Sequence, residues 1–310
     1  MFEDFWRPPT LEYIHWNSLY KLLSKYYDLE LSSDPDFLLY SCFGYEHLKY
    51  DCMRIFYAGE NVRPNFKECD YAFSFDYPIT ERNYRLPLYR LYPGYQSILA
   101  PRESDKILGE DRKFCCFLAS NPGGLERNKF FQLLSAYKKI DAGGKLFLNI
   151  DNPVPRGEEM EWIRRYKFCI SFENSSYPGY TTEKIVNALA AGTIPIYWGN
   201  PLVDRDFNTK SFINCHDFGS FEAVVEWVIE VDHDTQMQRA ILSEPVLLGN
   251  KEQDFCIEEN IISKFDQIFS SKKTYISSAK KKVQRFAYPH RQANRMLRRA
   301  LTKGSIEGFK

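Results

Sequence analysis

The chain has 310 residues, of which 44% are hydrophobic and 16% aromatic, and equal numbers of acidic and basic side chains leave it without net charge. This length accommodates about two domains of roughly 150 residues, each large enough to bury a core. None of the eight cysteines forms a C-x-x-C pair, and no segment approaches the length of about 18 apolar residues that spans a bilayer. A structural zinc site, a disulfide scaffold and a transmembrane helix are therefore not expected.

The first ten residues, MFEDFWRPPT, contain neither the positive nor the apolar segment of a secretory signal peptide. Three cysteines, Cys115, Cys116 and Cys169, lie within apolar runs, where free thiols behave as small hydrophobic side chains. These features predict a reduced, cytoplasmic protein.

Short apolar runs alternate with amphipathic segments along the chain, which is typical of a parallel α/β architecture. An amphipathic helix is predicted over Tyr13–Tyr27. Three strands should follow, at Asp36–Tyr40, Met53–Ala58 and Tyr71–Phe75. A stretch rich in proline and charge, residues 101–112, indicates a linker.

The same alternation then resumes. Strands are expected at 114–120, 145–150, 167–173 and 193–199, and helices at 125–139, 158–166, 182–191, 221–231, 233–242 and 258–268. The predicted domains are 1–100 and 113–270, joined by the 101–112 linker and followed by a 271–310 tail. The predicted fold class is α/β, with two Rossmann-like domains facing a cleft, and ligands in such sheets bind beyond the carboxyl ends of the strands.

Charge is concentrated in the tail. Residues 271–310 contain twelve basic residues and one acid, a net charge of +11, so residues 1–270 carry −11. One apolar stripe at helical spacing comprises Ala293, Met296, Leu297, Ala300 and Leu301. Such a helix is typical of segments that bind anionic membrane surfaces, which favours a peripheral location on the inner membrane face. A helix docked on the fold, a disordered tail and a nucleic-acid-binding segment are the alternatives, and nucleic acid is not the expected partner.

The segment 167–200 combines a strand, a polar loop, a helix and a second strand. Thr181 or Thr182 is expected to cap the helix, which places Lys184 in its first turn. The helix dipole disfavours a cation there by roughly a few tenths of a kcal/mol. A bound anion would instead be held by the free backbone amides and the ammonium. The spacing therefore indicates either a phosphate site or a solvated surface lysine.

Three segments together carry a family resemblance. The pattern S-F-E-N-S-x-x-x-G-Y-x-T-E-K-I, followed by A-G-x-I-P-I-Y-W-G, occupies Ser171–Gly199. F-Y-A-G-E-N-x-x-P-N-F occupies Phe56–Phe66, and L-A-S-N-P-x-x-x-x-R-N-K-F occupies Leu118–Phe130. With D-F-W at Asp4–Trp6, the chain resembles the α-1,3-fucosyltransferases of glycosyltransferase family 10, of bacterial type, over about residues 1–270.

The resemblance implies a fold of the GT-B type, with an acceptor-side first domain and a GDP-fucose-binding second domain. It implies inverting transfer of L-fucose from GDP-fucose to O3 or O4 of N-acetylglucosamine. The acceptor would be a LacNAc-type oligosaccharide or a glycolipid, as in Lewis antigens or lipopolysaccharide. No metal ion or other cofactor is expected to be obligatory.

The resemblance also implies roles for individual residues. Glu60 corresponds to the general base and Trp6 to an acceptor contact. Arg127 and Lys184 correspond to the cations on the donor diphosphate. The remaining donor-side residues are Asn174, Tyr180, Glu183, Ser120 and Asn121.

This set of residues matches the needs of sugar transfer. A carboxylate that takes the acceptor proton contributes about 10²–10⁴-fold. Two cations can neutralise the departing diphosphate in place of a metal ion. Taken alone, Glu60 also suits a turn carboxylate and Arg127 a solvated helix face, but the three segments occur together.

Several other motifs are expected to carry no chemistry. The D-x-D spacings at Asp34–Asp36 and Asp232–Asp234 are not expected to bind a metal, and His216 and His290 are expected to be core or surface residues. Two alternative functions remain. The first is another GT-B transferase that uses a different nucleotide sugar. The second is a non-enzymatic protein that binds nucleic acid or membranes through its tail.

Overall fold

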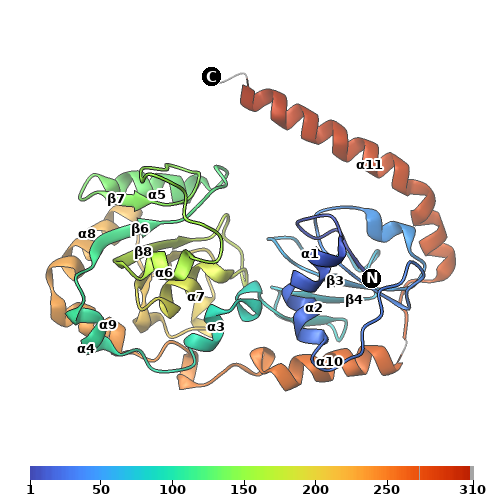
Figure 1. The fold of residues 1–310 in the computed structure, drawn as a ribbon, viewed down its shortest axis with the longest axis horizontal. Coiled ribbons are helices and arrows are strands. Elements are labelled where there is room, and N and C mark those ends of the chain that lie inside the picture. The colour runs from blue at the N-terminus through green and yellow to red at the C-terminus, as the bar shows by residue number, and fades with distance from the viewer. Residues whose placement is uncertain (272, 308–310) are drawn as a thin grey trace. The chain divides into compact units, whose positions relative to one another are not determined.

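The structure, a computed structural model, describes residues 1–271 and 273–307, with side chains to Met296 apart from residue 272. It divides into two compact units. The first consists of Met1–Leu86 together with Glu258–Lys310, and the second of Pro87–Ile257 (Figure 1). Each unit contains a parallel sheet with helices, which confirms the predicted α/β class.

The first unit is built on a five-stranded parallel sheet with the order β1-β2-β3-β4-β5. Its strands are β1 (Phe2–Glu3), β2 (Phe37–Tyr40), β3 (Met53–Tyr57), β4 (Tyr71–Ser74) and β5 (Asn83–Arg85). The residues of β3 and β4 are buried throughout. Strands buried along their whole length are typical of parallel sheets covered on both faces.

Two short helices replace the single helix expected over Tyr13–Tyr27. They are α1 (Leu11–Trp16) and α2 (Ser18–Leu23). The break lies at Asn17, whose backbone is extended and whose Oδ1 accepts hydrogen bonds from the backbone amides of Leu19 (2.9 Å) and Tyr20 (3.4 Å). Asn17 therefore caps a new helix instead of continuing the first.

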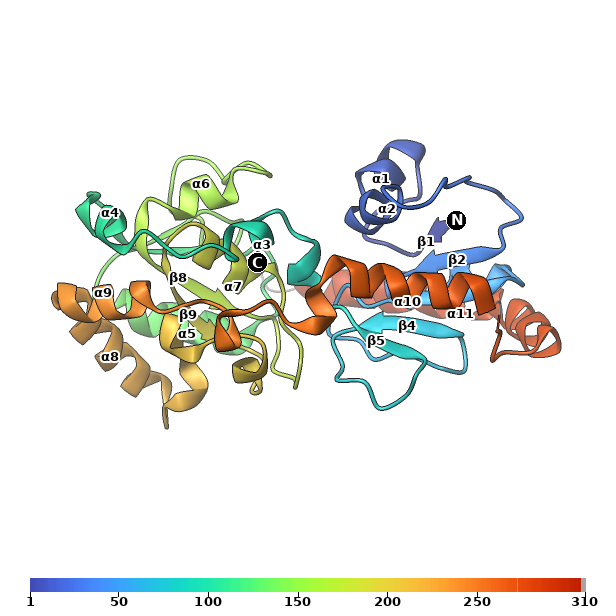
Figure 2. The ribbon, with the colours of Figure 1, turned by 90° about the horizontal axis from the view of Figure 1, so that it is seen from below.

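Helix α10 (Glu258–Ser271) returns to the first unit and packs on its sheet, and Figure 2 shows it in front of the strands. Its Phe265 ring stacks on Phe73 of β4 at 4.2 Å between centroids. Ile261 and Ile268 of the same helix are also buried. The expected boundary at residue 270 is therefore wrong, because the sheet of the first unit needs this apolar helix face to cover it.

Helix α11 (Ser278–Glu307) follows and shows that residues 271–310 are not a separate tail. The backbone amides of Tyr275 and Ile276 donate to Asp70 Oδ1 at 2.7 and 2.9 Å. Within the helix, the buried Lys281 donates to the carbonyl oxygen of Cys52 at 2.7 Å. The first half of α11 belongs to the first unit, while the side chains of Leu297, Ala300 and Leu301 lie outside the described residues.

The second unit has a five-stranded parallel sheet with the order β10-β9-β8-β6-β7. Its strands are β6 (Lys113–Phe117), β7 (Ile140–Ala142), β8 (Tyr166–Phe172), β9 (Ile194–Trp198) and β10 (Ile213–Asn214). Numbered within the unit, this is the doubly wound order 2-1-3-4-5. The order reverses between β6 and β8.

The strand expected at 145–150 is wrong, because the edge of this sheet is formed by β7. Asn149 lies in that segment and pairs with β7 through its side chain. Its Oδ1 accepts from the Ala142 amide at 2.7 Å, and its Nδ2 donates to the Ile140 carbonyl at 2.8 Å. A side-chain amide thus replaces a further strand at this edge.

The described helices of the second unit are α3 (Gly94–Ser97), α4 (Ser104–Gly109), α5 (Leu125–Ser135), α6 (Glu159–Ile163), α7 (Glu183–Ala190), α8 (Phe221–His233) and α9 (Thr235–Ser243). The predicted 101–112 linker is wrong, since it contains α4 and lies within this unit. Arg102 holds this segment against the end of α9 by donating hydrogen bonds to the carbonyl oxygens of Ile241 (2.6 Å) and Glu244 (3.2 Å). The chain passes between units at Leu86–Pro87 instead.

Candidate active site

The predicted donor residues gather at the carboxyl ends of β6 and β8. Ser120 and Asn121 follow β6, while Asn174 follows β8. Because the strand order reverses between these two strands, their loops diverge and leave room for a ligand. The topology therefore places the candidate site where doubly wound sheets bind their ligands.

Arg127 lies at the centre of this group. Its guanidinium is buried, with the residue 2% exposed. Nη1 donates to Asn174 Oδ1 at 2.7 Å and Nη2 donates to the Asn121 carbonyl oxygen. Its Nε has no hydrogen-bond partner among the described residues. Gly124 permits this position, since a Cβ there would lie 2.9 Å from Arg127 Cζ.

The Arg127 guanidinium is therefore only partly satisfied. Burial lowers the pKa of Arg127, while the nearby Glu173 carboxylate raises it. A buried donor without a partner costs about 1–3 kcal/mol. A ligand that brings oxygen atoms to this point would remove that cost.

Lys184 lies in the first turn of α7, as the sequence predicts, but it faces an anion of the protein itself. Its Nζ lies 3.1 Å from Glu173 Oε2 and 3.6 Å from Glu183 Oε1. It also donates to Thr182 Oγ1 at 2.8 Å. The lysine is thus not a solvated surface residue, and its ammonium is paired with a carboxylate of the protein.

Glu173 is the residue that sequence reasoning missed. It is fully buried at the end of β8. Its carboxylate accepts from the Thr182 amide and the Thr182 hydroxyl, both at 2.7 Å. Burial raises the pKa of Glu173, and the Lys184 ammonium opposes that shift. Lys184 could have pointed to this residue. A lysine in the first turn of a helix is stabilised by a nearby anion, and Glu173 is an acidic residue 11 positions before it.

Gly199, at the end of β9, makes room for the Glu173 side chain. A Cβ at Gly199 would lie 2.4 Å from Glu173 Cγ. The Gly199 amide donates to Nε2 of His216 at 3.3 Å, and burial lowers the pKa of His216. His216 is therefore a neutral histidine of the fold, in agreement with the sequence.

The other predicted donor residues differ in their access to solvent. Tyr180 is buried, whereas Glu183 is half-buried. Ser120 and Asn121 are exposed, and their side chains accept from the backbone amides of Lys145 (3.3 Å) and Gly123 (2.9 Å). Tyr180 is therefore closed to solvent in this structure, whereas Ser120 and Asn121 are accessible.

The two predicted acceptor-side residues lie together in the first unit. Gly59 follows β3 and precedes Glu60, and the Trp6 indole lies directly on it, since a Cβ at Gly59 would be 2.7 Å from Trp6 Cζ2. The ring of Phe43 supports Trp6 at 5.1 Å between centroids. Trp6 remains 44% exposed, so part of the indole is open to solvent, and the glycine that it contacts immediately precedes Glu60 in the chain.

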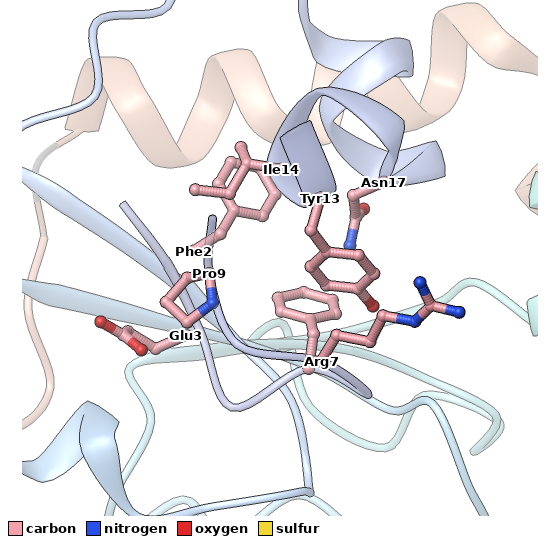
Figure 3. Close-up of a pocket in the computed structure, with 8 residues that line it drawn as sticks. Phe2, Glu3, Arg7, Pro9, Tyr13, Ile14 and Asn17 are labelled. Carbon is pink, nitrogen blue, oxygen red and sulfur yellow. The ribbon is translucent and has the colours of Figure 1, made fainter. Parts of the chain in front are cut away.

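A small hollow in the first unit does not involve these residues. It has a volume of about 190 Å³ and is lined by Phe2, Glu3, Phe5, Arg7, Pro9, Tyr13, Ile14 and Asn17. Figure 3 shows side chains from the N-terminal segment and from α1 converging on it. Part of this volume is open solvent, and the lining includes none of the predicted site residues, so the hollow is not proposed as a ligand site.

The D-x-D spacing at Asp232 has a structural explanation. Asp232 pairs with Lys138 at 2.7 Å and with Lys167 at 3.1 Å. Across residues 1–271 and 273–307, the structure contains no group of three or more His, Cys, Asp or Glu side chains placed to hold a metal ion. In the same ranges, no helix has the length and apolar character needed to cross a bilayer.

Comparisons with known families match both units. Residues 1–92 match the family model for the α-(1,3)-fucosyltransferase FucT N-terminal domain. Residues 109–241 match the model for the C-terminal part of glycosyltransferase family 10 (fucosyltransferase). Both matches agree with the resemblance carried by the sequence motifs.

Individual proteins are similar as well. The α-(1,3)-fucosyltransferase FucT of Helicobacter pylori is 32% identical over 268 residues, covering 73% of this chain and 55% of that protein. The human 3-galactosyl-N-acetylglucosaminide 4-α-L-fucosyltransferase FUT3 is 36% identical over 111 residues, covering 35% of this chain and 30% of that protein. The chain thus spans about half the length, or less, of these curated relatives.

Solved structures align over most of the chain. A crystal structure of an α1,3-fucosyltransferase has a TM-score of 0.76 and 28% identity, covering 89% of this chain and 91% of that one. The structure of such an enzyme with GDP-fucose has a TM-score of 0.73 and 26% identity, with the same coverage. The chain therefore belongs to glycosyltransferase family 10, the fucosyltransferase family, and has an α/β fold of the GT-B type.

Proposed function

We propose that the protein transfers L-fucose from GDP-fucose to O3 or O4 of N-acetylglucosamine in a LacNAc-type oligosaccharide or glycolipid. One observation carries the proposal: Arg127, Asn174 and Lys184 lie together at the switch point of the second unit, with Arg127 Nε unsatisfied among the described residues. A similar α1,3-fucosyltransferase has been crystallised with GDP-fucose, which supports the choice of donor.

Donor binding exchanges internal contacts for phosphate contacts. In the structure Arg127 is held by Asn121 and Asn174, and Lys184 is held by Glu173 and Thr182. A diphosphate offers more negative charge than an amide oxygen and accepts the planar guanidinium fork bidentately. Binding would draw Arg127 Nη1 away from Asn174 and turn Lys184 Nζ toward the phosphate.

Glu173 then has a positioning role. Its carboxylate keeps Thr182 and the start of α7 in place through the Thr182 amide and hydroxyl. It also supplies a counter-charge for Lys184 before the donor arrives. A lysine held in this way loses less rotamer freedom on binding phosphate.

On the acceptor side, Glu60 is proposed as the general base and the Trp6 indole as a surface for the sugar. A carboxylate takes the proton of the attacking hydroxyl as the new bond forms. A single displacement of this kind inverts the anomeric centre, so β-linked GDP-fucose yields an α-linked product. The exposed indole offers an apolar face with a polar edge, which suits a sugar ring.

We further propose that the reaction needs no metal ion. Arg127 and Lys184, together with the amides at the start of α7, would stabilise the charge that develops on the diphosphate. Transfer should persist in excess EDTA. A complete loss of activity that added divalent cation restores would overturn this part of the proposal.

The proposed location is the cytoplasmic face of a membrane. Along α11, the exposed apolar residues Val283 and Phe286 lie among the exposed basic residues Lys280, Lys282 and Arg285. An exposed mixture of this kind favours the boundary of an anionic bilayer. A glycolipid acceptor would be displayed at the same surface.

Two assays test the enzymatic proposal. GDP should raise the melting temperature, whereas UDP, ADP and an oligonucleotide should have little effect. Stabilisation by UDP alone would indicate another nucleotide sugar. Stabilisation by the oligonucleotide alone would indicate a nucleic-acid-binding protein. Incubation with GDP-fucose and N-acetyllactosamine, or its β-1,3-linked isomer, followed by NMR, then identifies the linkage. Absence of any fucosylated product with both acceptors, despite GDP binding, would overturn the proposed acceptor class.

A further inference from the structure

The C-terminal helix α11 contacts the part of the first unit that carries Trp6. The 3₁₀ helix η1 (Glu46–Lys49) connects the two. Tyr288 of α11 donates to Glu46 Oε1 at 2.5 Å, and Gln292 donates to the same oxygen at 2.7 Å. Arg291 pairs with Glu68, whose other carboxylate oxygen faces His47 Nε2 at 3.5 Å.

The opposite side of η1 rests on Asp4. The Asp4 carboxylate accepts from the backbone amides of Glu46 (3.0 Å) and His47 (2.9 Å). It also pairs with Nδ1 of His47 at 2.7 Å. The two contacts with His47 are buried and the contact with the Glu46 amide is partly buried, so water competes little for the Asp4 carboxylate.

Asp4 in turn sets the path of the chain into Trp6. Its φ is +56°, a left-handed conformation that non-glycine residues adopt only where their surroundings hold them. Its carbonyl oxygen accepts from the Phe43 amide at 3.0 Å. Gly44 lies against its carboxylate, because a Cβ at Gly44 would be 1.7 Å from Asp4 Oδ1. Phe43 is the ring that supports the Trp6 indole.

Electrostatics strengthen the same connection. Hydrogen bonds and charge from His47 and Arg291 outweigh burial and lower the pKa of Glu68 to about 2. Glu68 is therefore ionised at neutral pH, midway between helix α11 and His47. A series of contacts therefore runs from Arg291 through Glu68, His47 and Asp4 to Phe43, whose ring packs against Trp6.

We infer that docking of α11 positions the acceptor surface, with Asp4, His47, Glu68 and Arg291 acting as positioning residues for Trp6 beside Glu60. The inference rests on the proposed acceptor role of Trp6. Since the series lies wholly in the first unit, its disruption should affect use of the acceptor and leave nucleotide binding in the second unit unchanged. The C-terminal helix would then contribute to catalysis as well as to the fold.

The test loosens α11 without removing it. The double variant Tyr288→Phe/Arg291→Gln loses a hydrogen bond and an ion pair to this region, and Arg291→Lys restores the charge. Arg285→Gln is the matched control, because Arg285 lies on the exposed side of the same helix. The double variant should raise the acceptor KM by about tenfold, the scale expected of a small misplacement, with GDP affinity by calorimetry unchanged. Arg291→Lys alone should approach the parent protein.

Asp4→Asn provides a second test, because asparagine tolerates a positive φ while losing the charge paired with His47. It should raise the acceptor KM and leave the GDP-fucose KM unchanged. In a Trp6→Ala background, neither variant should change the acceptor KM further. An unchanged acceptor KM in both variants, or equal losses for donor and acceptor, overturns the inference.

Hydrogen exchange separates this inference from the proposed function. If Trp6→Ala alone leaves the acceptor KM unchanged, the acceptor role of Trp6 fails. The physical connection is then judged by the amides of Phe43, Glu46 and His47, which hydrogen-bond to Asp4. They should exchange faster in Tyr288→Phe/Arg291→Gln than in Arg285→Gln, and equal exchange shows that α11 does not hold them.

Discussion

At the scale of single residues, the candidate site contains charges that are already partnered within the protein. Arg127 and Lys184 flank the buried Glu173, and each has hydrogen bonds to its own loop. Removing one member of such a group leaves another charge unpaired in a place with little water. Substitutions must therefore be interpreted together with protein stability, and a control is needed for each.

The first prediction concerns Glu60. Glu60→Gln keeps the size of the side chain but cannot accept the proton, so transfer should fall by about 10²–10⁴-fold. GDP affinity should not change, because Glu60 lies in the first unit and the nucleotide residues lie in the second. Steady-state assays and calorimetry measure the two quantities, and a variant with parental transfer activity would refute the role of base.

The second prediction concerns the diphosphate contacts. Arg127→Ala and Lys184→Ala should each weaken GDP binding by about 1.5–3 kcal/mol, the range for hydrogen bonds to charged groups. Lys129→Ala is the control, since Lys129 is an exposed residue of the same helix as Arg127. Thermal melting accompanies the calorimetry, and unchanged GDP affinity in both folded variants would exclude the proposed contacts.

At the scale of helices and strands, buried segments matched their predictions most closely. Strand β3 was expected at Met53–Ala58 and ends one residue earlier, and β9 was expected at 193–199 and occupies Ile194–Trp198. Two errors occurred where a side chain replaced backbone pairing, as Asn17 did within α1–α2 and Asn149 did beside β7. Hydrophobic periodicity contains no information about side chains that take the place of backbone hydrogen bonds.

The loop after β6 depends on a close backbone approach. A Cβ at Gly144 would lie 2.0 Å from the Ala119 carbonyl oxygen, and backbone atoms cannot rotate away. Gly144→Ala should therefore destabilise the second unit by about 1–3 kcal/mol, as overpacking does. It should also weaken GDP binding, since Ser120 and Asn121 follow Ala119 directly. Denaturant unfolding tests this, with Gly219→Ala, which meets no atom within 4 Å, as the control.

Helix α11 leads to a prediction that differs from expectations based on its charge alone. Removal of all residues after Ser270 deletes Lys281, which lies 3.2 Å from the fully buried Asp70, and the backbone amides of Tyr275 and Ile276, which donate to Asp70 Oδ1. Loss of a partner from a buried ion pair costs about 3–5 kcal/mol. The truncated protein should lose the cooperative unfolding of its first unit. If the truncated protein unfolds at the same temperature and as cooperatively as the full chain in calorimetry, the deleted residues do not stabilise the first unit.

At the scale of the whole molecule, the residues proposed for donor and for acceptor belong to different units. The proposed charged donor residues belong to Pro87–Ile257, and the proposed base and acceptor surface belong to the unit that the C-terminal helices complete. The charge of +11 in residues 271–310 is not all available to a partner, because Lys281 and Arg291 pair with Asp70 and Glu68. The proposed attraction to an anionic membrane must therefore come from the remaining basic residues.

The final prediction concerns this attraction. The full chain should float with anionic vesicles at low ionic strength and dissociate as salt is added, because exposed charges are screened. Each engaged Lys or Arg contributes about 1 kcal/mol. A chain that ends at Met296 keeps the docked part of α11 but loses Arg298, Arg299, Lys303 and Lys310, so its flotation should decrease. Equal flotation of the two chains would exclude residues 297–310 as an anchor.

The sequence by itself determined the α/β class and the family, because those properties depend on local patterns and on three motifs, and the same motifs predicted the donor-side residues. It could not determine that Glu173 is the internal partner of Lys184, since two residues 11 positions apart meet only when β8 and α7 pack together. Nor could it assign residues 258–295 to the first unit. That assignment depends on Phe265 meeting Phe73 and on Lys281 meeting Asp70, contacts between distant parts of the chain that only the tertiary structure brings about.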